Sequence, residues 1–301
     1  MNPVLMIFLD GVGIGKEDYQ FNPFFKYGFK TFTEIFGKIP SSKSRRFKGK
    51  NVFLFPTDAR LGVKGFPQSG TGQTAIFTGV NVSKMIGKHF GPYPYSTTIP
   101  ILEKKNILRA YLDRNQKVCF ANAYPQIFFD YQKKGRGRLS CTSLCCRLSG
   151  LRLNRLTDLK RGKALTAEIT NERWIKKLNY DLPEITPERA AKRLLNIANK
   201  NKFTLYEFYL TDHMGHGREE KDFNKLLKNL DDFLYSIITK MNMNSMTLVI
   251  CSDHGNLEDL SVKTHTLNPS LTIIAGLKAE KLSKTIKILT DIKPAIMKYC
   301  K

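Results

Sequence analysis

Three apolar stretches that lie far apart in the sequence each end in an aspartate. They are VLMIFLD, ending at Asp10, LYEFYLTD, ending at Asp212, and TLVICSD, ending at Asp253. Each is short and apolar, which is typical of a buried strand. Such strands belong in a parallel sheet when helical sequence lies between them, because helices then cover both faces. The pattern therefore favours an α/β fold.

The rest of the chain repeats this alternation of strand and helix. It predicts a mainly parallel central sheet with helices on both faces. We expect strands at 3–10, 51–58, 117–124, 203–212, 246–253 and 270–276. We expect helices just after 68–72 and at 98–115, 186–201 and 220–241. The length of 301 residues suits one large domain, and we predict a single domain over 1–301.

Residues 130–175 do not follow the alternation. Their periodicity is irregular, and residues 131–163 hold ten Lys or Arg against a single acid, Asp158. We interpret 130–175 as an insertion or a small cap within the domain.

The chain is strongly basic, with a formal net charge of +23. A basic excess favours an anionic partner, although the same charge can also be spread over solvated faces. The densest basic segments, 43–50 and 131–163, contain few aromatic residues that would stack on bases. We therefore predict a small anionic, phosphorylated substrate and regard nucleic acid as a less favoured partner.

The sequence also carries information on location. No apolar run approaches the length of a membrane span, so we expect no membrane partner. The apolar run VLMIFL is closed by Asp10 and lacks a basic leader, so we expect no signal peptide and a cytoplasmic protein. The six cysteines form no C-x-x-C pair, and we expect reduced thiols rather than a zinc site.

Two glycine-rich turns fail the tests for nucleotide binding. After Asp10, the spacing G-x-G-x-x-G places Lys16 or Asp18 where the third glycine is required. The segment GFPQSGTGQT (65–74) lacks the lysine of a P-loop. It remains a hydroxyl-rich turn before a helix, where backbone N–H groups can hold an anion.

The strand-end aspartates point to metal binding instead. The carboxyl ends of parallel strands lie along one edge of a sheet, so Asp10, Asp212 and Asp253 are expected to converge there. Their mutual repulsion predicts a divalent cation between them. Three of the five histidines follow the same strand ends, namely His216, His254 and His265. Asp and His ligands without Cys favour Zn²⁺ or Mn²⁺, and six ligands favour two ions. We expect His213 to contact these ligands without binding a metal itself.

Five stretches, taken in order, resemble the alkaline phosphatase superfamily. They are LDGVG (9–13), QSGTGQTAIFTG (68–79), TDHMGH (211–216), CSDHGN (251–256) and THTLNP (264–269). Within that superfamily they are most similar to the branch of cofactor-independent phosphoglycerate mutase and phosphopentomutase.

The resemblance implies a set of ligands and a nucleophile. One metal would be held by Asp212, His216 and His265. The other would be held by Asp10, Asp253, His254 and the nucleophile. Family members carry a Ser or Thr nucleophile three residues before a glycine, which corresponds to Ser69, with Thr71 as the alternative. Ser69 also fits a helix N-cap. Gln73 stands where the mutases have a histidine, and the chain has no room for their large second domain.

We predict a metal-dependent phosphoryl-transfer enzyme that works through a phosphoserine at Ser69. It would be a phosphatase (a hydrolase) or a phosphomutase (an isomerase). A phosphodiesterase would use the same metal centre. A sulfatase fits poorly, because PQSGTGQ lacks the C/S-x-P-x-R context. The alternative from another class is a basic anion-binding or nucleic-acid-binding protein that has lost turnover.

Overall fold

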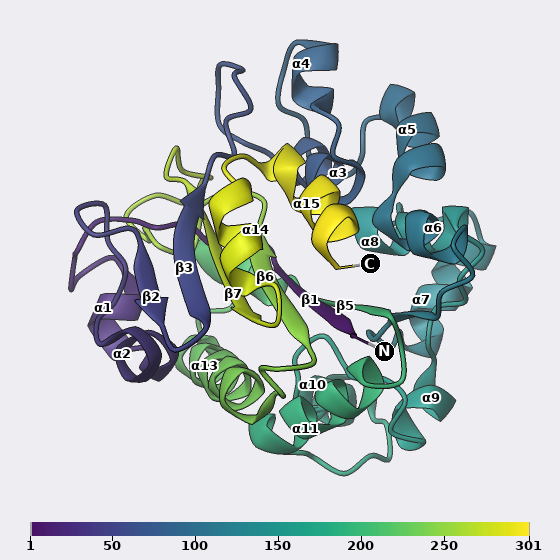
Figure 1. The fold of residues 1–301 in the computed structure, drawn as a ribbon. Helices are drawn as coiled ribbons and strands as arrows, with labels where there is room; N and C mark the ends of the chain where they lie inside the picture. The colour runs from purple at the N-terminus through teal and green to yellow at the C-terminus, as the bar shows by residue number, and fades with distance from the viewer. Residues whose placement is uncertain (1, 301) are drawn as a thin grey trace.

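The computed structural model describes residues 2–300 and is built around one seven-stranded sheet (Figure 1). The strand order is β2-β3-β7-β6-β1-β5-β4. The strands are β1 (Val4–Leu9), β2 (Phe47–Gly49), β3 (Val52–Thr57), β4 (Val118–Phe120), β5 (Phe203–Phe208), β6 (Thr247–Ser252) and β7 (Ser270–Gly276). All residues of β1, β5, β6 and β7 are buried, as expected for apolar strands covered on both faces.

The predicted α/β class and the parallel core are confirmed. β1 pairs in parallel with β5 on one side and with β6 on the other, and β4 pairs in parallel with β5. The remaining pairings, β6–β7, β7–β3 and β3–β2, are antiparallel, which the sequence did not predict. Within the described residues, no helix separates β6 from β7, and the loop 253–269 returns the chain in the opposite direction.

Two large cores pack against the sheet, one on each face, and a smaller third cluster lies around Trp174. Alternate residues of β1 divide between them: Leu5 and Ile7 face one core, while Met6 and Phe8 face the other. Figure 1 shows α11 and α13 on the first face and α3, α14 and α15 on the second. The helices are α1 (Pro23–Tyr27), α2 (Lys30–Phe36), α3 (Ser69–Thr78), α4 (Val82–Ile86), α5 (Ile99–Lys105), α6 (Ile107–Leu112), α7 (Gln126–Lys133), α8 (Cys141–Leu148), α9 (Leu156–Lys160), α10 (Glu172–Leu178), α11 (Pro187–Ala198), α12 (Leu210–Gly215), α13 (Phe223–Lys240), α14 (Ala279–Thr285) and α15 (Ile292–Tyr299), with short 3₁₀ turns at Ser96–Thr98 and Leu289–Asp291.

Two predicted elements have different bounds in the structure. The single helix expected at 98–115 is divided into α5 and α6 at Asn106, whose ψ of 153° is extended. The Asn106 side chain accepts a hydrogen bond from the Arg109 amide and so begins α6 as its N-cap. The strand expected at 203–212 ends at Phe208, and Asp212 lies on α12.

The basic segment 130–175 contains α8 and α9, together with the last turn of α7 and the first part of α10. Helix α8 contacts α3, and its residues Cys145 and Cys146 are part of the second core. The interpretation of 130–175 as an insertion remains a prediction. All six cysteines are free thiols. Within residues 2–300, no helix combines the length and the apolar character needed to span a bilayer.

Candidate metal centre

The three predicted aspartates lie at the carboxyl ends of neighbouring strands. Asp10 follows β1, Asp253 follows β6, and Asp212 lies in the first turn of α12, directly after β5. Strands β5, β1 and β6 are adjacent and in register, so their ends meet at one edge of the sheet. The structure therefore brings together the carboxylates that the sequence predicted to converge.

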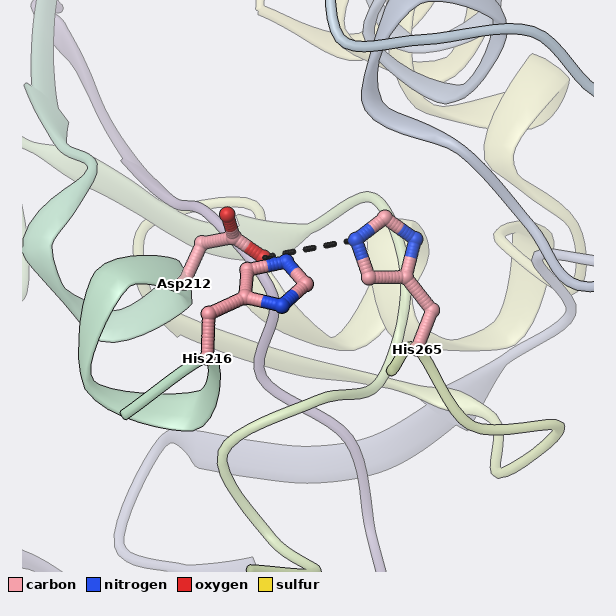
Figure 2. A group of neighbouring side chains, drawn as sticks. All are labelled: Asp212, His216 and His265. Carbon is pink, nitrogen blue, oxygen red and sulfur yellow. Dashed lines mark ion pairs between the residues drawn. The ribbon is translucent and has the colours of Figure 1, made fainter. Parts of the chain in front are cut away.

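One group of possible ligands consists of Asp212, His216 and His265 (Figure 2). The Nε2 atom of His216 lies 3.3 Å from Oδ1 of Asp212, and Nε2 of His265 lies 3.5 Å from the same oxygen. His216 follows Asp212 by four residues, so the end of α12 presents both side chains on one side. His265 reaches them from the loop between β6 and β7.

A second group surrounds His254, which is completely buried. Its Nε2 atom lies 3.3 Å from Oδ1 of Asp10 and 3.6 Å from Oδ2 of Asp253. Ligand atoms of Asp10, Asp212 and His254 also lie within 4.8 Å of one another, so Asp212 stands between the two groups. The rings of His254 and His265 stack with their centroids 3.8 Å apart, which joins the two groups into one centre.

Ser69, rather than Thr71, faces this centre. The Ser69 Oγ lies 3.0 Å from Nε2 of His254. The Thr71 hydroxyl is held elsewhere, because it donates to the Gln68 carbonyl and accepts from the Phe90 amide. The N-cap interpretation of Ser69 is wrong: Gln68 is the N-cap of α3 and Ser69 is its first helical residue. The amides of Thr71 and Gly72 already donate to Phe90 and Gln68, so they do not serve an anion.

Backbone carbonyls orient the three histidines. Nδ1 of His216 donates to the Lys263 carbonyl at 2.8 Å, and Nδ1 of His265 donates to the Pro67 carbonyl at 2.7 Å. Nδ1 of His254 lies 3.3 Å from the Gly255 carbonyl. A carbonyl can only accept, so these contacts place a proton on Nδ1 and turn Nε2 towards the carboxylates. Metal-binding histidines are commonly oriented in this way.

The electrostatics of the centre also fit bound cations. Burial raises the pKa of Asp10 to about 7, and Asp253 adds to the rise. Burial likewise raises the pKa of Asp253. Burial alone would raise the pKa of Asp212, but hydrogen bonds with His216 and His265 lower it well below its ordinary value. Among the described residues, Oδ1 of Asp10 is buried and has no hydrogen-bond partner. Buried carboxylates in such surroundings require compensating positive charge, and a set of Asp and His donors suits a divalent ion.

Gln73 links two of the acids. Its Nε2 donates to Oδ2 of Asp10 and to Oδ2 of Asp253, at 3.2 Å each. It occupies the position where the mutase pattern has a histidine. This neutral donor satisfies Oδ2 of each carboxylate. The other oxygen of Asp10 faces His254, and the other oxygen of Asp253 accepts from the Gly11 amide.

Sequence reasoning missed Glu258, which joins the loops that carry the ligands. Its buried carboxylate accepts hydrogen bonds from the amides of Gly13 and Asn256, at 2.8 Å each. It also accepts from the Thr266 hydroxyl at 2.5 Å and from the Asn268 side-chain amide at 3.0 Å. These four donors belong to the loops that follow Asp10, His254 and His265. Glu258 therefore holds three ligand-bearing loops together.

Glu258 also explains the glycines after Asp10. A Cβ on Gly13 would lie 2.6 Å from the Glu258 carboxyl group, and one on Gly15 would lie 2.8 Å from its side chain. A Cβ on Gly255 would collide with the same carboxylate. The glycine-rich turn thus makes room for a buried acid, and not for a nucleotide. The sequence shows Glu258 within SDHGNLED (252–259), close to the predicted ligands, but it does not show which distant residues this acid contacts.

His213 is paired with Glu219 and not, as expected, with a metal ligand. Its Nδ1 lies 3.4 Å from Oε1 of Glu219, and its ring packs on Tyr209. Asn256 supports a ligand instead: its side-chain amide donates a hydrogen bond to Oδ1 of Asp212 at 2.7 Å.

Comparison with known proteins agrees with this geometry. Residues 175–301 match the model of the Metalloenzyme superfamily. Similar curated proteins are 2,3-bisphosphoglycerate-independent phosphoglycerate mutases. The Mycoplasma genitalium enzyme is 30% identical over 132 residues, which cover 42% of this chain and 26% of that protein. The Mycoplasmoides gallisepticum enzyme is 29% identical over 127 residues, or 40% and 25%. The chain thus matches about a quarter of the length of these relatives.

Two solved structures match over nearly the whole chain. An alkaline phosphatase from the Antarctic bacterium TAB5 covers 99% of this chain and 97% of its own, with a TM-score of 0.56 and 13% identity. The PH0037 protein of Pyrococcus horikoshii covers 99% and 96%, with a TM-score of 0.52 and 13% identity. At such identities the likeness is one of fold. The chain has an alkaline-phosphatase-like fold, and the resemblance found in the sequence is confirmed.

Proposed function

We propose that this protein is a two-metal phosphoryl-transfer enzyme that acts on a small phosphorylated metabolite through a phosphoserine at Ser69. The observation that supports this most strongly is the position of the Ser69 hydroxyl. Its Oγ lies 3.0 Å from His254, within a centre made of three carboxylates and three histidines. A hydroxyl so placed is suited to attack phosphorus.

The ligand sets follow from the two groups. Asp212, His216 and His265 would hold one cation. Asp10, Asp253, His254 and Ser69 would hold the other, with Zn²⁺ or Mn²⁺ as the ions that suit these donors best. Bound cations would lower the pKa of the serine hydroxyl and neutralise charge on the phosphoryl oxygens.

The chain itself supplies the nucleophile and its position. The Ser69 hydroxyl gives up its proton, and its Oγ–P bond forms as the bond from phosphorus to the leaving oxygen breaks. The leaving oxygen takes up a proton, and the resulting phosphoserine then passes its phosphoryl group to an acceptor. Water as acceptor gives a phosphatase, and a second substrate hydroxyl gives a phosphomutase. Helix α3 begins at Ser69 and is held rigidly, because Gly70 packs on the Tyr93 carbonyl and Gly72 on Asp253. A fixed nucleophile lowers the entropic cost of reaching the transition state.

The proposal is tested with metal-loaded protein and p-nitrophenyl phosphate. We expect activity with Mn²⁺ or Zn²⁺ and a fall of at least about 10³-fold in Ser69→Ala, because the nucleophile is lost. Thr71→Ser is the matched control and should keep its activity, since it retains the hydroxyl that binds Phe90. Full activity of Ser69→Ala would contradict the phosphoserine. Tight, salt-sensitive binding of nucleic acid without any turnover would favour a binding protein instead.

A further inference from the structure

A cavity of about 230 Å³ lies at the carboxyl ends of β4 and β5. Its walls include Tyr124, Trp174 and Tyr209, and its charged lining residues are Glu168, Arg173, Lys177 and Glu207. Tyr209 directly precedes α12, the helix that carries Asp212. The cavity therefore opens at the edge of the sheet where α/β proteins bind their ligands.

Glu207 connects this cavity to the centre. It lies on β5 directly opposite Phe8 of β1, two residues before Asp10. Side chains two residues apart on a strand point to the same face, so Glu207 and Asp10 share one face of the sheet. Diagonal neighbours on adjacent strands are roughly 7 to 8 Å apart. A molecule bound at the centre can therefore extend across β5 to Glu207.

The cavity has both an acceptor and a donor to offer. The Thr142 hydroxyl donates to Oε2 of Glu207 at 2.6 Å, and among the described residues no group hydrogen-bonds Oε1. Arg173 bonds to Glu219 through its terminal nitrogens, while its buried Nε has no partner within residues 2–300. A buried donor such as Arg173 Nε is normally hydrogen-bonded, so it calls for a ligand atom or a water molecule.

We propose that this cavity binds the leaving group of the substrate and that the leaving group is an uncharged polyol. A hydroxyl can donate to Glu207 and accept from Arg173 at once, whereas a carboxylate can only accept. The two cations of the lining already have acidic partners, because Arg173 pairs with Glu219 and Lys177 with Asp222. A carboxylate would therefore add a negative charge next to Glu207 and Glu168, and like charges brought together in a site are costly. The aromatic walls suit the carbon skeleton of such a molecule. This inference rests on the proposed function, because it takes Ser69 as the group that receives the phosphoryl.

The test compares two compounds that differ at a single carbon, glycerol 3-phosphate and 3-phosphoglycerate. The first carries a hydroxymethyl group where the second carries a carboxylate. Burial raises the pKa of Glu207 to about 7, so the assay is run at pH 8. For the metal-loaded wild type, we expect kcat/KM to favour glycerol 3-phosphate at least about tenfold. Glu207→Gln keeps the shape of the side chain and should reduce this ratio severalfold. Glu184→Gln, at an exposed position, is the control and should leave the ratio unchanged.

Equal kcat/KM for the two compounds, or an unchanged ratio in a folded Glu207→Gln protein, would overturn the inference. Thermal unfolding establishes whether the variant is folded. Activity on p-nitrophenyl phosphate separates the two proposals: if it is present while the ratio is near one, only the cavity assignment fails. If no turnover is found with any substrate, the proposed function fails. Calorimetric binding of the same two compounds to the metal-loaded protein then decides the cavity assignment, with tighter binding of glycerol 3-phosphate as the expected result.

Discussion

Glu258 offers a quantitative test of how the ligand-bearing loops are held. In Glu258→Ala, the amides of Gly13 and Asn256 lose their acceptor inside a buried loop cluster and cannot turn to find another. An unsatisfied buried donor costs about 1–3 kcal/mol, so the two amides together cost about 2–6 kcal/mol. This is a large part of the 5–15 kcal/mol that typically stabilises a folded protein.

Glu258→Gln should be much milder. Its carbonyl oxygen can still accept from both backbone amides, while the Thr266 hydroxyl can rotate and the Asn268 amide can flip to accept from the new NH₂ group. We therefore expect Gln to restore at least half of the stability lost in Ala. The loss that remains reflects weaker hydrogen bonds to a neutral acceptor.

Urea unfolding monitored by circular dichroism measures both variants, and metal titration measures whether the loops still present their ligands. We expect weaker metal binding in Glu258→Ala than in Glu258→Gln. The matched control is Glu280→Gln, which removes an exposed pair with Lys284 and should leave the stability close to that of wild type. The reasoning is refuted if Glu258→Ala unfolds within about 1 kcal/mol of wild type and binds metal equally well.

Three further predictions concern the centre and its surroundings. The metal-free protein should lose stability as pH rises. The folded pKa of Asp10 is raised to about 7, so its contribution is lost between about pH 4 and 7. Burial alone would lower the pKa of His254, but Asp253 and Asp10 raise it to about 10, so its contribution is lost as pH rises from about 6.5 towards 10. Because a metal ion replaces these protons, the increase in Tm on adding Zn²⁺ or Mn²⁺ should be larger at pH 8 than at pH 5. An increase in Tm that does not depend on pH would contradict the ligand assignment. Gln73→Glu places a fourth acid in the centre, between Asp10 and Asp253, and should lower the Tm of the metal-free protein. Gln73→Leu is the uncharged comparison. A Tm of Gln73→Glu equal to that of wild type would show that Gln73 does not bridge the two acids. Gly70→Ala should displace the loop at Tyr93 and reduce activity, since its Cβ would collide with the Tyr93 carbonyl, and unchanged kcat/KM would exclude that packing from the positioning of Ser69.

Much of the centre could be predicted from local sequence. The aspartates at strand ends and the histidines behind them are local patterns, and the rule that parallel strands end at one edge brings them together. The choice between Ser69 and Thr71 was less accessible. Both are hydroxyls in one turn of α3, and only the fold shows that Thr71 is occupied by Gln68 and Phe90.

Other features depend on contacts between distant segments. Glu258 and Gln73 act through partners more than sixty residues away or on other loops, and single-sequence patterns carry no trace of such pairs. The direction of β7 depends on a loop that turns back without a helix. The break between α5 and α6 did have a local signal, because Asn106 is a favourable N-cap inside otherwise helical sequence.

The most direct test of the account is a crystal structure of the protein soaked with Mn²⁺, with anomalous scattering used to locate the ions. Two peaks are expected in each protein chain. One should lie about 2.0–2.3 Å from donor atoms of Asp212, His216 and His265, and the other at a similar distance from Asp10, Asp253 and His254. Peaks elsewhere, or none at this edge of the sheet, would contradict it.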